Sequence, residues 1–125
     1  MSVKVDLTAL ADKMADYDFA YLLTVSDDQR PHAVAVQPVM RGRAVTVGSL
    51  GNRTLANLAA RPAVTLLFPP REQGWYSLIV DGRAATDSDG TCVEPAHAVL
   101  HRPADHSIGT SDSSCGNDCL PVSAT

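Results

Sequence analysis

Short apolar runs alternate with polar turn segments along most of this sequence. Runs that are rich in Val, Leu and Thr and bounded by Gly, Pro, Asp or Ser predict β-strands. The predicted strands cover residues 20–25, 32–40, 44–47, 63–68, 75–86 and 92–101. Pro38 cannot donate a ladder hydrogen bond, so its strand should lie at an edge or bulge there. Asp81-Gly82 predicts a bulge or tight bend in the fifth strand.

Two segments show helical spacing instead of alternation. Residues 6–17 place four apolar side chains on one stripe behind Asp6, a possible N-cap, and predict an N-terminal helix. A second, short helix is predicted from Asn52, its expected N-cap, to Arg61, because Pro62 disfavours helical geometry before it. Strands at this spacing, joined by short turns, indicate a small, mostly antiparallel barrel.

The length and composition fit one small domain. With 125 residues, we expect a folded unit over residues 1–102 and a polar tail over residues 103–125. The composition is 45% hydrophobic but only 5% aromatic, so the core should consist mainly of Val, Leu and Ala. Small side chains bury limited area, and association with a second copy could complete such a core.

The charge balance excludes some classes of partner. A formal net charge of -4 argues against nucleic-acid binding, which normally requires a basic surface. Arginines nevertheless gather between Arg30 and Arg71, which predicts a basic patch in an acidic protein.

The sequence shows no apolar run of membrane-spanning length and no leader-like segment at its start, so we expect no membrane association and a cytoplasmic location.

The turn before the second helix carries the main candidate chemistry. A helix N-terminus offers unpaired N–H groups and partial positive charge, and the Arg53 guanidinium can fork onto a phosphate. The side chains of Ser49, Asn52 and Thr54 add polar groups, so the turn is a candidate seat for a phosphorylated ligand. A simpler interpretation stays open, in which Asn52 only caps the helix and Arg53 is only a solvated first-turn residue.

Other reactive residues give weaker signals. His97 and His101 share a face of the predicted last strand, where they lie about twice as far apart as on a helix, and no second ligand pair accompanies them. Cys115 and Cys119 leave three interpretations open: reduced cysteines of a polar tail, a redox pair, or part of a tail that folds over the site as a lid. We predict no metal site, and no catalytic residue because no nucleophile motif occurs.

Four stretches, in this order, resemble the pyridoxamine 5'-phosphate oxidase-like, flavin-reductase-type split β-barrel family: FAYLLTVSDDQRPHAVAVQPV, RAVTVGSLGNRTLANLAARPAVTLLF, GWYSLIVDGRAAT and CVEPAHAVLH. The family usually has a Lys or Arg near the start of its short helix, and Arg53 occupies that position in the second stretch. The family pattern then continues with Asn-Leu, two or three further residues and Arg-Pro or Asn-Pro, which residues 57–62 match. The resemblance implies a mostly β, six-stranded antiparallel split β-barrel with one N-terminal helix and one short inserted helix.

The resemblance also implies a homodimer with two cofactor sites at the subunit interface. By this resemblance, the phosphate would contact Ser49, Asn52, Arg53 and Thr54. The tricyclic ring would be lined by Val36, Gln37, Pro38, Val47 and Gly48, with Trp75 expected from the second subunit. The cofactor would be FMN or, as in many short members of the actinobacterial branch, the deazaflavin coenzyme F-420.

The implied function is an oxidoreductase that transfers hydride or electrons between this cofactor and a small organic substrate. True pyridoxamine 5'-phosphate oxidases are longer and carry further basic residues near the C-terminus, so we do not expect vitamin B6 phosphate as the substrate. Two alternatives stay open: a non-catalytic flavin- or haem-type carrier or sensor on the same barrel, and a structural dimer with an empty pocket.

Overall fold

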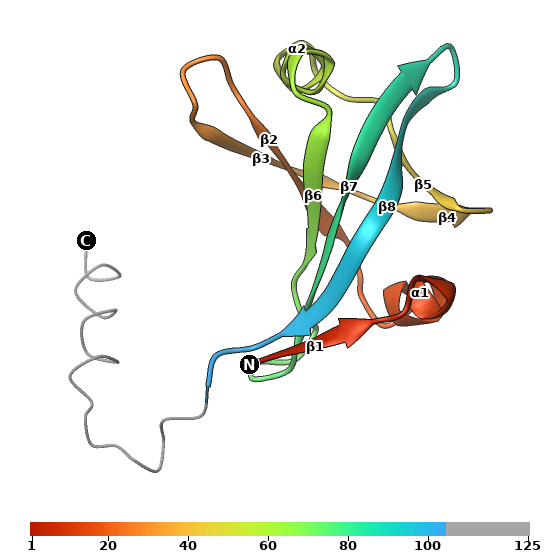
Figure 1. Cartoon of the computed structure of the whole chain (residues 1–125), viewed down its shortest axis with the longest axis vertical. Helices are drawn as coiled ribbons and strands as arrows, with labels where there is room; N and C mark the ends of the chain where they lie inside the picture. Colours follow the sequence, from red (N-terminus) through yellow and green to blue (C-terminus); the bar gives the residue numbers. More distant parts are fainter. Residues whose placement is uncertain (105–125) are drawn as a thin grey trace.

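Eight antiparallel strands follow one another in residues 1–104, which are the residues that the computed structural model describes (Figure 1). The strands are β1 (Ser2–Val5), β2 (Ala20–Val25), β3 (Pro31–Val36), β4 (Val39–Arg41), β5 (Ala44–Gly48), β6 (Ala63–Phe68), β7 (Ser77–Asp87) and β8 (Gly90–His101). A 3-10 turn η1 (Leu7–Ala9) leads into the short helix α1 (Leu10–Met14), and helix α2 (Asn52–Ala60) connects β5 to β6.

The sheet closes because its two edge strands are consecutive in the chain. The strand order is β3-β2-β6-β7-β8-β5-β4, with β1 added along β8. Val36 at the end of β3 pairs with Ala20 of β2, whereas Val39 at the start of β4 pairs with Thr46 of β5. The intervening Gln37-Pro38 is therefore a corner at which the chain changes partners, as the missing N–H of Pro38 predicts.

The predicted split β-barrel is confirmed, with corrections to its elements. If β3 and β4 are counted as one interrupted strand, the barrel has the six predicted strands. Strand β1 (Ser2–Val5) is a further strand that was not predicted. A single strand over residues 32–40 was the wrong prediction, because the corner at Gln37-Pro38 divides it. The bulge at Asp81-Gly82 is confirmed by a register shift between β7 and β8.

The N-terminal helix is shorter than predicted. Asp6 caps only the 3-10 turn, where its carboxylate accepts hydrogen bonds from the Thr8 N–H at 3.0 Å and the Thr8 hydroxyl at 2.9 Å. These bonds, the backbone one first, hold the pKa of Asp6 below its ordinary value. Ala9 then leaves helical geometry with φ -100 and ψ 2, so α1 starts anew and ends at Met14. The predicted N-terminal helix and its Asp6 cap are therefore confirmed, but its extent over residues 6–17 is wrong, because a 3-10 turn replaces its first turn and α1 ends at Met14.

The core lies inside the barrel and consists mainly of Val, Leu and Ala, as the composition predicts. Leu22, Leu66, Leu78 and Val93 are fully buried there. Tyr17 packs edge-on against Phe68, with ring centroids 5.8 Å apart, and donates its hydroxyl hydrogen to the Tyr76 carbonyl oxygen at 2.8 Å. Burial, with a smaller contribution from the Asp16 charge, raises the pKa of Tyr17.

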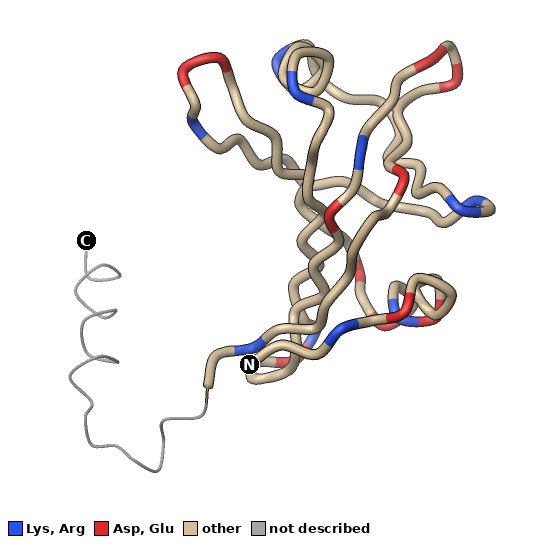
Figure 2. The backbone as a smooth tube through the Cα atoms, viewed as in Figure 1, with Lys and Arg blue, Asp and Glu red and all other residues tan. Residues whose placement is uncertain are grey.

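The arginines do not form the predicted basic patch. Figure 2 shows the basic positions spread over α2, the β4–β5 turn and the loops. Arg30 pairs with Asp28, Arg61 with Asp27 and Arg71 with Asp18, which neutralises three of them locally. The prediction was wrong because nearness in sequence is not nearness in the fold: Arg61 and Arg71 meet aspartates far away in the sequence, and Arg30 meets one in its own turn. No helix within residues 1–104 is long and apolar enough to cross a bilayer.

Gly82 makes the β7–β8 bulge possible. A Cβ placed on it would overlap the Glu94 carbonyl oxygen and lie 2.8 Å from a methyl carbon of Val93. We expect Gly82→Ala to destabilise the fold by about 1–3 kcal/mol because backbone must shift to admit the methyl group. Urea unfolding measures this effect.

Ala85→Ser, three residues further along β7 at an exposed position, is the matched control. It should change the free energy of unfolding by less than about 0.5 kcal/mol. Equal stability of Gly82→Ala and the unmodified protein would contradict the close approach of the two strands.

Candidate functional site

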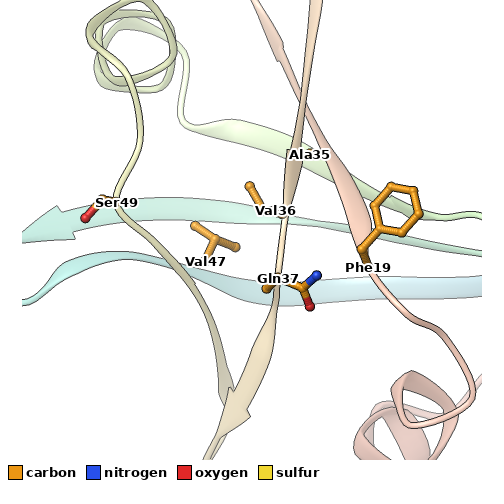
Figure 3. Close-up of a pocket in the computed structure, with 6 residues that line it drawn as sticks. All are labelled: Phe19, Ala35, Val36, Gln37, Val47 and Ser49. Carbon is orange, nitrogen blue, oxygen red and sulfur yellow. The ribbon is translucent and has the colours of Figure 1, made fainter.

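A pocket of about 320 Å³ lies at the corner where the chain passes from β3 to β4. Its lining residues are Phe19, Ala35, Val36, Gln37, Val47 and Ser49. Figure 3 shows the Gln37 side chain extending from this corner toward Phe19, while the side chains of Val36, from β3, and Val47, from β5, lie to the left of the Gln37 amide. Four of its six lining side chains are therefore apolar, the other two are an amide and a hydroxyl, and none is ionisable.

A second pocket, of about 430 Å³, lies at the N-terminus of α2 and shares Ala35 and Ser49 with the first. The remaining lining residues are His32, Val34, Leu50, Gly51, Asn52, Arg53 and Thr54. Because the two pockets share lining residues, they form one groove; its first pocket, with mostly apolar side chains, is called the apolar end, and its second pocket, which adds Asn52, Arg53 and Thr54, is called the polar end. We call this groove, over both sets of lining residues, the corner groove.

The N-terminus of α2 is open toward the polar end of the corner groove. The N-cap is Gly51, with φ -73 and ψ 165, and no side chain among the described residues caps the helix. The prediction of Asn52 as the N-cap is wrong, because Asn52 is already the first helical residue. The N–H groups of the first turn are thus left without a side-chain acceptor, and they carry the positive end of the helix dipole. This arrangement favours an anion.

Arg53 adds a full positive charge at the same end. It is exposed, lies in the first turn of α2 and takes part in none of the ion pairs within residues 1–104. Arg61, at the other end of α2, is instead engaged by Asp27 at 2.7 Å and by the Val25 carbonyl oxygen at 2.9 Å. Of these two arginines, Arg53 is therefore the one available to a ligand.

A buried polar contact fixes α2 against the barrel. The Asn57 side-chain amide donates to the Thr24 hydroxyl oxygen at 3.1 Å, and the two residues are only 5% and 2% exposed. Leu58 of the same helix is buried in the core. Since buried amide and hydroxyl groups are costly without partners, this bond specifies how α2 lies on β2. It thereby positions the first turn of α2 over the groove.

Most of the sequence-predicted site residues come together in this groove. Val36, Gln37 and Val47 line its apolar end, Asn52, Arg53 and Thr54 line its polar end, and Ser49 lies in both. Gly48 and Pro38 do not line either pocket. Gly48 has φ +78 at the end of β5, where it turns the chain toward α2, and Pro38 is half-buried at the strand corner.

Trp75 is not part of the groove within one chain. It lies in the β6–β7 connection, at the end of the sheet away from α2 (Figure 1), and is 58% exposed. Its ring packs edge-on against Tyr76, with centroids 5.4 Å apart. Its assignment to a cofactor site in a second subunit stays a prediction.

Sequence reasoning missed several lining residues. Phe19 and Ala35 belong to the apolar end, and His32, Val34, Leu50 and Gly51 to the polar end. Ala35 could have been found, because strand alternation places it on the same face as Gln37 and its small side chain leaves room there. Phe19 carries no such signal, since it precedes β2 and reaches the groove only through the fold.

The groove has the chemistry that a flavin-type cofactor requires. Its apolar end can take a flat ring system, and the Gln37 amide can exchange hydrogen bonds with polar ring atoms. Its polar end combines helix N–H groups, hydroxyls and one guanidinium, which together suit a phosphate monoester. Within residues 1–104, no three His, Cys, Asp or Glu side chains gather in a way that could hold a metal ion.

The histidines and cysteines singled out in the sequence lie outside the corner groove or outside the described residues. His97 is exposed on β8, and the His101 Nδ1 lies 3.0 Å from the Ser2 hydroxyl oxygen. Both histidines are on a strand, as predicted. Cys115, Cys119 and the polar tail from residue 105 onward lie outside the described residues.

Comparison with known proteins identifies the family. The family model for pyridoxamine 5'-phosphate oxidase matches residues 8–108, so this chain belongs to that family. An uncharacterised protein of Mycobacterium bovis is 47% identical to this chain, in a match that covers 96% of each.

Solved structures of low sequence identity show the same fold. A FAD-binding protein from Mesorhizobium loti matches with a TM-score of 0.65 at 13% identity, over 82% of this chain and 98% of the other. An F-420 reductase matches with a TM-score of 0.59 at 15% identity, over 70% and 94%. A FMN-binding protein from Syntrophomonas wolfei matches with a TM-score of 0.58 at 13% identity, over 78% and 84%.

The Thr24–Asn57 contact can be tested directly. Thr24→Val keeps the side-chain shape and removes the acceptor, which leaves the Asn57 amide buried without its partner. We expect a loss of roughly 1–3 kcal/mol in the free energy of unfolding. Chemical denaturation measures it.

Thr65→Val serves as the control, because the Thr65 hydroxyl donates to Asp81 at 2.7 Å on the exposed side of the sheet. This variant should lose less than about 0.5 kcal/mol. A Thr24→Val protein as stable as the control would show that the bond does not hold α2.

Proposed function

We propose that this chain binds FMN in the corner groove and acts as an oxidoreductase on a small organic substrate. The observation that carries the proposal is the groove itself, in which an apolar slot continues into an uncapped helix N-terminus beside Arg53. The FAD-binding, FMN-binding and F-420-reductase names of proteins with this fold support a flavin-type ligand.

Each end of the groove has a separate task in this proposal. Val36, Val47 and Phe19 exclude water from one side of the ring, and the Gln37 amide orients it by hydrogen bonding. The first turn of α2, with Arg53, holds the phosphate and so fixes the depth at which the ring lies. When bound, the flavin supplies the capacity to accept and donate hydride or single electrons.

F-420 is the alternative cofactor. FMN and F-420 both join a tricyclic ring to a phosphate group, so the same slot and the same helix N-terminus suit either. Separate absorbance and fluorescence titrations with the two cofactors distinguish them, since only the preferred one should saturate at low concentration.

We further propose that the protein is a homodimer that completes the groove. An apolar row crosses the outer face of the sheet, because register places Tyr21, Leu67, Ile79 and Val99 side by side on four neighbouring strands. Tyr21 is exposed and the other three are only partly buried in the single chain. A second copy covering this row would bury apolar area and could bring its Trp75 to the groove.

Replacing Arg53 tests the phosphate contact. We expect Arg53→Gln to weaken FMN binding by about 10- to 100-fold, the range for hydrogen bonds to a charged group. Riboflavin, which has the ring but no phosphate, should bind the variant and the unmodified protein equally. Fluorescence quenching gives both dissociation constants.

Arg41→Gln is the matched control, because Arg41 is also exposed and also outside the ion pairs of residues 1–104. It should bind FMN normally. If Arg53→Gln bound FMN with unchanged affinity, the phosphate would not bind at the N-terminus of α2 as proposed.

The dimer is tested on the apolar row. Ile79→Glu places a charge at its centre, so the variant should sediment as a monomer and lose FMN affinity by tenfold or more, about 1.4 kcal/mol. Ala85→Glu, at an exposed position further along β7, should leave the dimer intact. Analytical ultracentrifugation reports the mass, and a monomeric unmodified protein would refute this part of the proposal.

A further inference from the structure

A separate pocket of about 660 Å³ opens between the N-terminal helical turn and the β4–β5 turn. Its lining residues are Leu7, Thr8, Leu10, Ala11, Met40, Gly42, Arg43, Arg83, Glu94, Pro95 and Ala96. None of them lines the corner groove. We call this space the helix pocket; the family's flavin and the proposed function do not account for it.

The interior of the helix pocket is apolar. Leu10 is fully buried at its base, and Met40 packs against the core. Leu7 is 40% exposed, so part of its side chain is accessible to a ligand. Pockets of this size with mainly apolar walls and a few polar groups are typical of small-molecule sites.

The charged residues of the helix pocket are unbalanced. Two arginines, Arg43 and Arg83, face one carboxylate, Glu94, among its lining residues. The ion pairs within residues 1–104 all use other arginines, even though Arg83 and Glu94 are register partners across β7 and β8. Arginine guanidinium groups bind carboxylates through paired hydrogen bonds, so two of them beside an apolar base favour an anionic head group on an apolar body.

The backbone of β7 and β8 beside the helix pocket contains a β-bulge. Asp81 pairs with His97 while Gly82 pairs with Pro95, so Ala96 is the extra residue of the β-bulge. The bulge pushes Pro95 and Ala96 into the lining of the helix pocket. It requires Gly82, since any side chain there would overlap the Glu94 carbonyl oxygen. Bulges of this kind often reshape a sheet beside a binding site.

We propose that the helix pocket binds a small amphipathic carboxylate, with its apolar part over Leu7, Leu10 and Met40 and its carboxylate at Arg43 and Arg83. This ligand is distinct from the flavin, and the two bind independently because their pockets share no residue.

Sodium octanoate is the probe. Isothermal titration calorimetry of the full chain should show one saturable site, and the affinity should be the same with and without saturating FMN. 1-Octanol, which has the same chain and no charge, should bind at least tenfold more weakly. Equal affinity for octanoate and 1-octanol, or loss of octanoate binding when FMN is added, would overturn the proposal.

Variants localise the site. Arg43→Gln and Arg83→Gln should each weaken octanoate binding about tenfold, whereas Arg41→Gln, at the end of β4 and outside the lining, should not. Ala96→Trp, at an exposed position of the bulge, should block the pocket without disturbing the core. Normal octanoate affinity in Arg43→Gln and Ala96→Trp, with native circular dichroism spectra, would show that the ligand binds elsewhere.

Discussion

The change of pairing partner at Gln37-Pro38 is the constraint on which this structure depends. One chain segment hydrogen-bonds to β2 before the corner and to β5 after it, so the two edges of the sheet are joined covalently. Pro38 has no N–H to offer a ladder, which makes the break in pairing compatible with its chemistry. The barrel closes there, and the same corner supplies Val36 and Gln37 to the groove.

The groove combines this corner with a helix held by a single buried polar contact. The Asn57–Thr24 bond and the buried Leu58 fix α2 on the barrel, and Gly51 begins the helix without a side chain that would occupy its N–H groups. Apolar walls and an open helix N-terminus are therefore adjacent as a direct consequence of how β5 leads into α2. We infer that this adjacency is what a phosphorylated ring system would recognise.

The sequence predicted the barrel and much of the groove because both follow from local patterns. Alternation and turn residues located six barrel strands, and the Gly/Ser/Asn turn located the first turn of α2. The strand β1 was missed because four residues give too short a pattern, and it forms only by pairing with β8. The helix over residues 6–17 was overpredicted because the apolar stripe behind the Asp6 cap does not reveal the break at Ala9, where a 3-10 turn gives way to a short α-helix.

Features made by tertiary contacts were beyond sequence reasoning. Asn is a residue type that often caps helices, yet the geometry of the β5–α2 connection makes Gly51, and not Asn52, the N-cap. The apparent basic patch disappears because the fold spreads the arginines over several elements and pairs three of them with Asp28, Asp27 and Asp18. The place of Phe19 in the corner groove and the helix pocket itself likewise arise only when the chain folds.

The most direct test of the central claim compares riboflavin and FMN as ligands of the unmodified protein. The two differ only in the phosphate, so the ratio of their dissociation constants measures what the N-terminus of α2 contributes. Our account predicts saturable binding of both, with FMN tighter by tenfold or more, about 1.4 kcal/mol. Equal affinities, or no binding of either, would contradict the assignment of the corner groove as a flavin phosphate site.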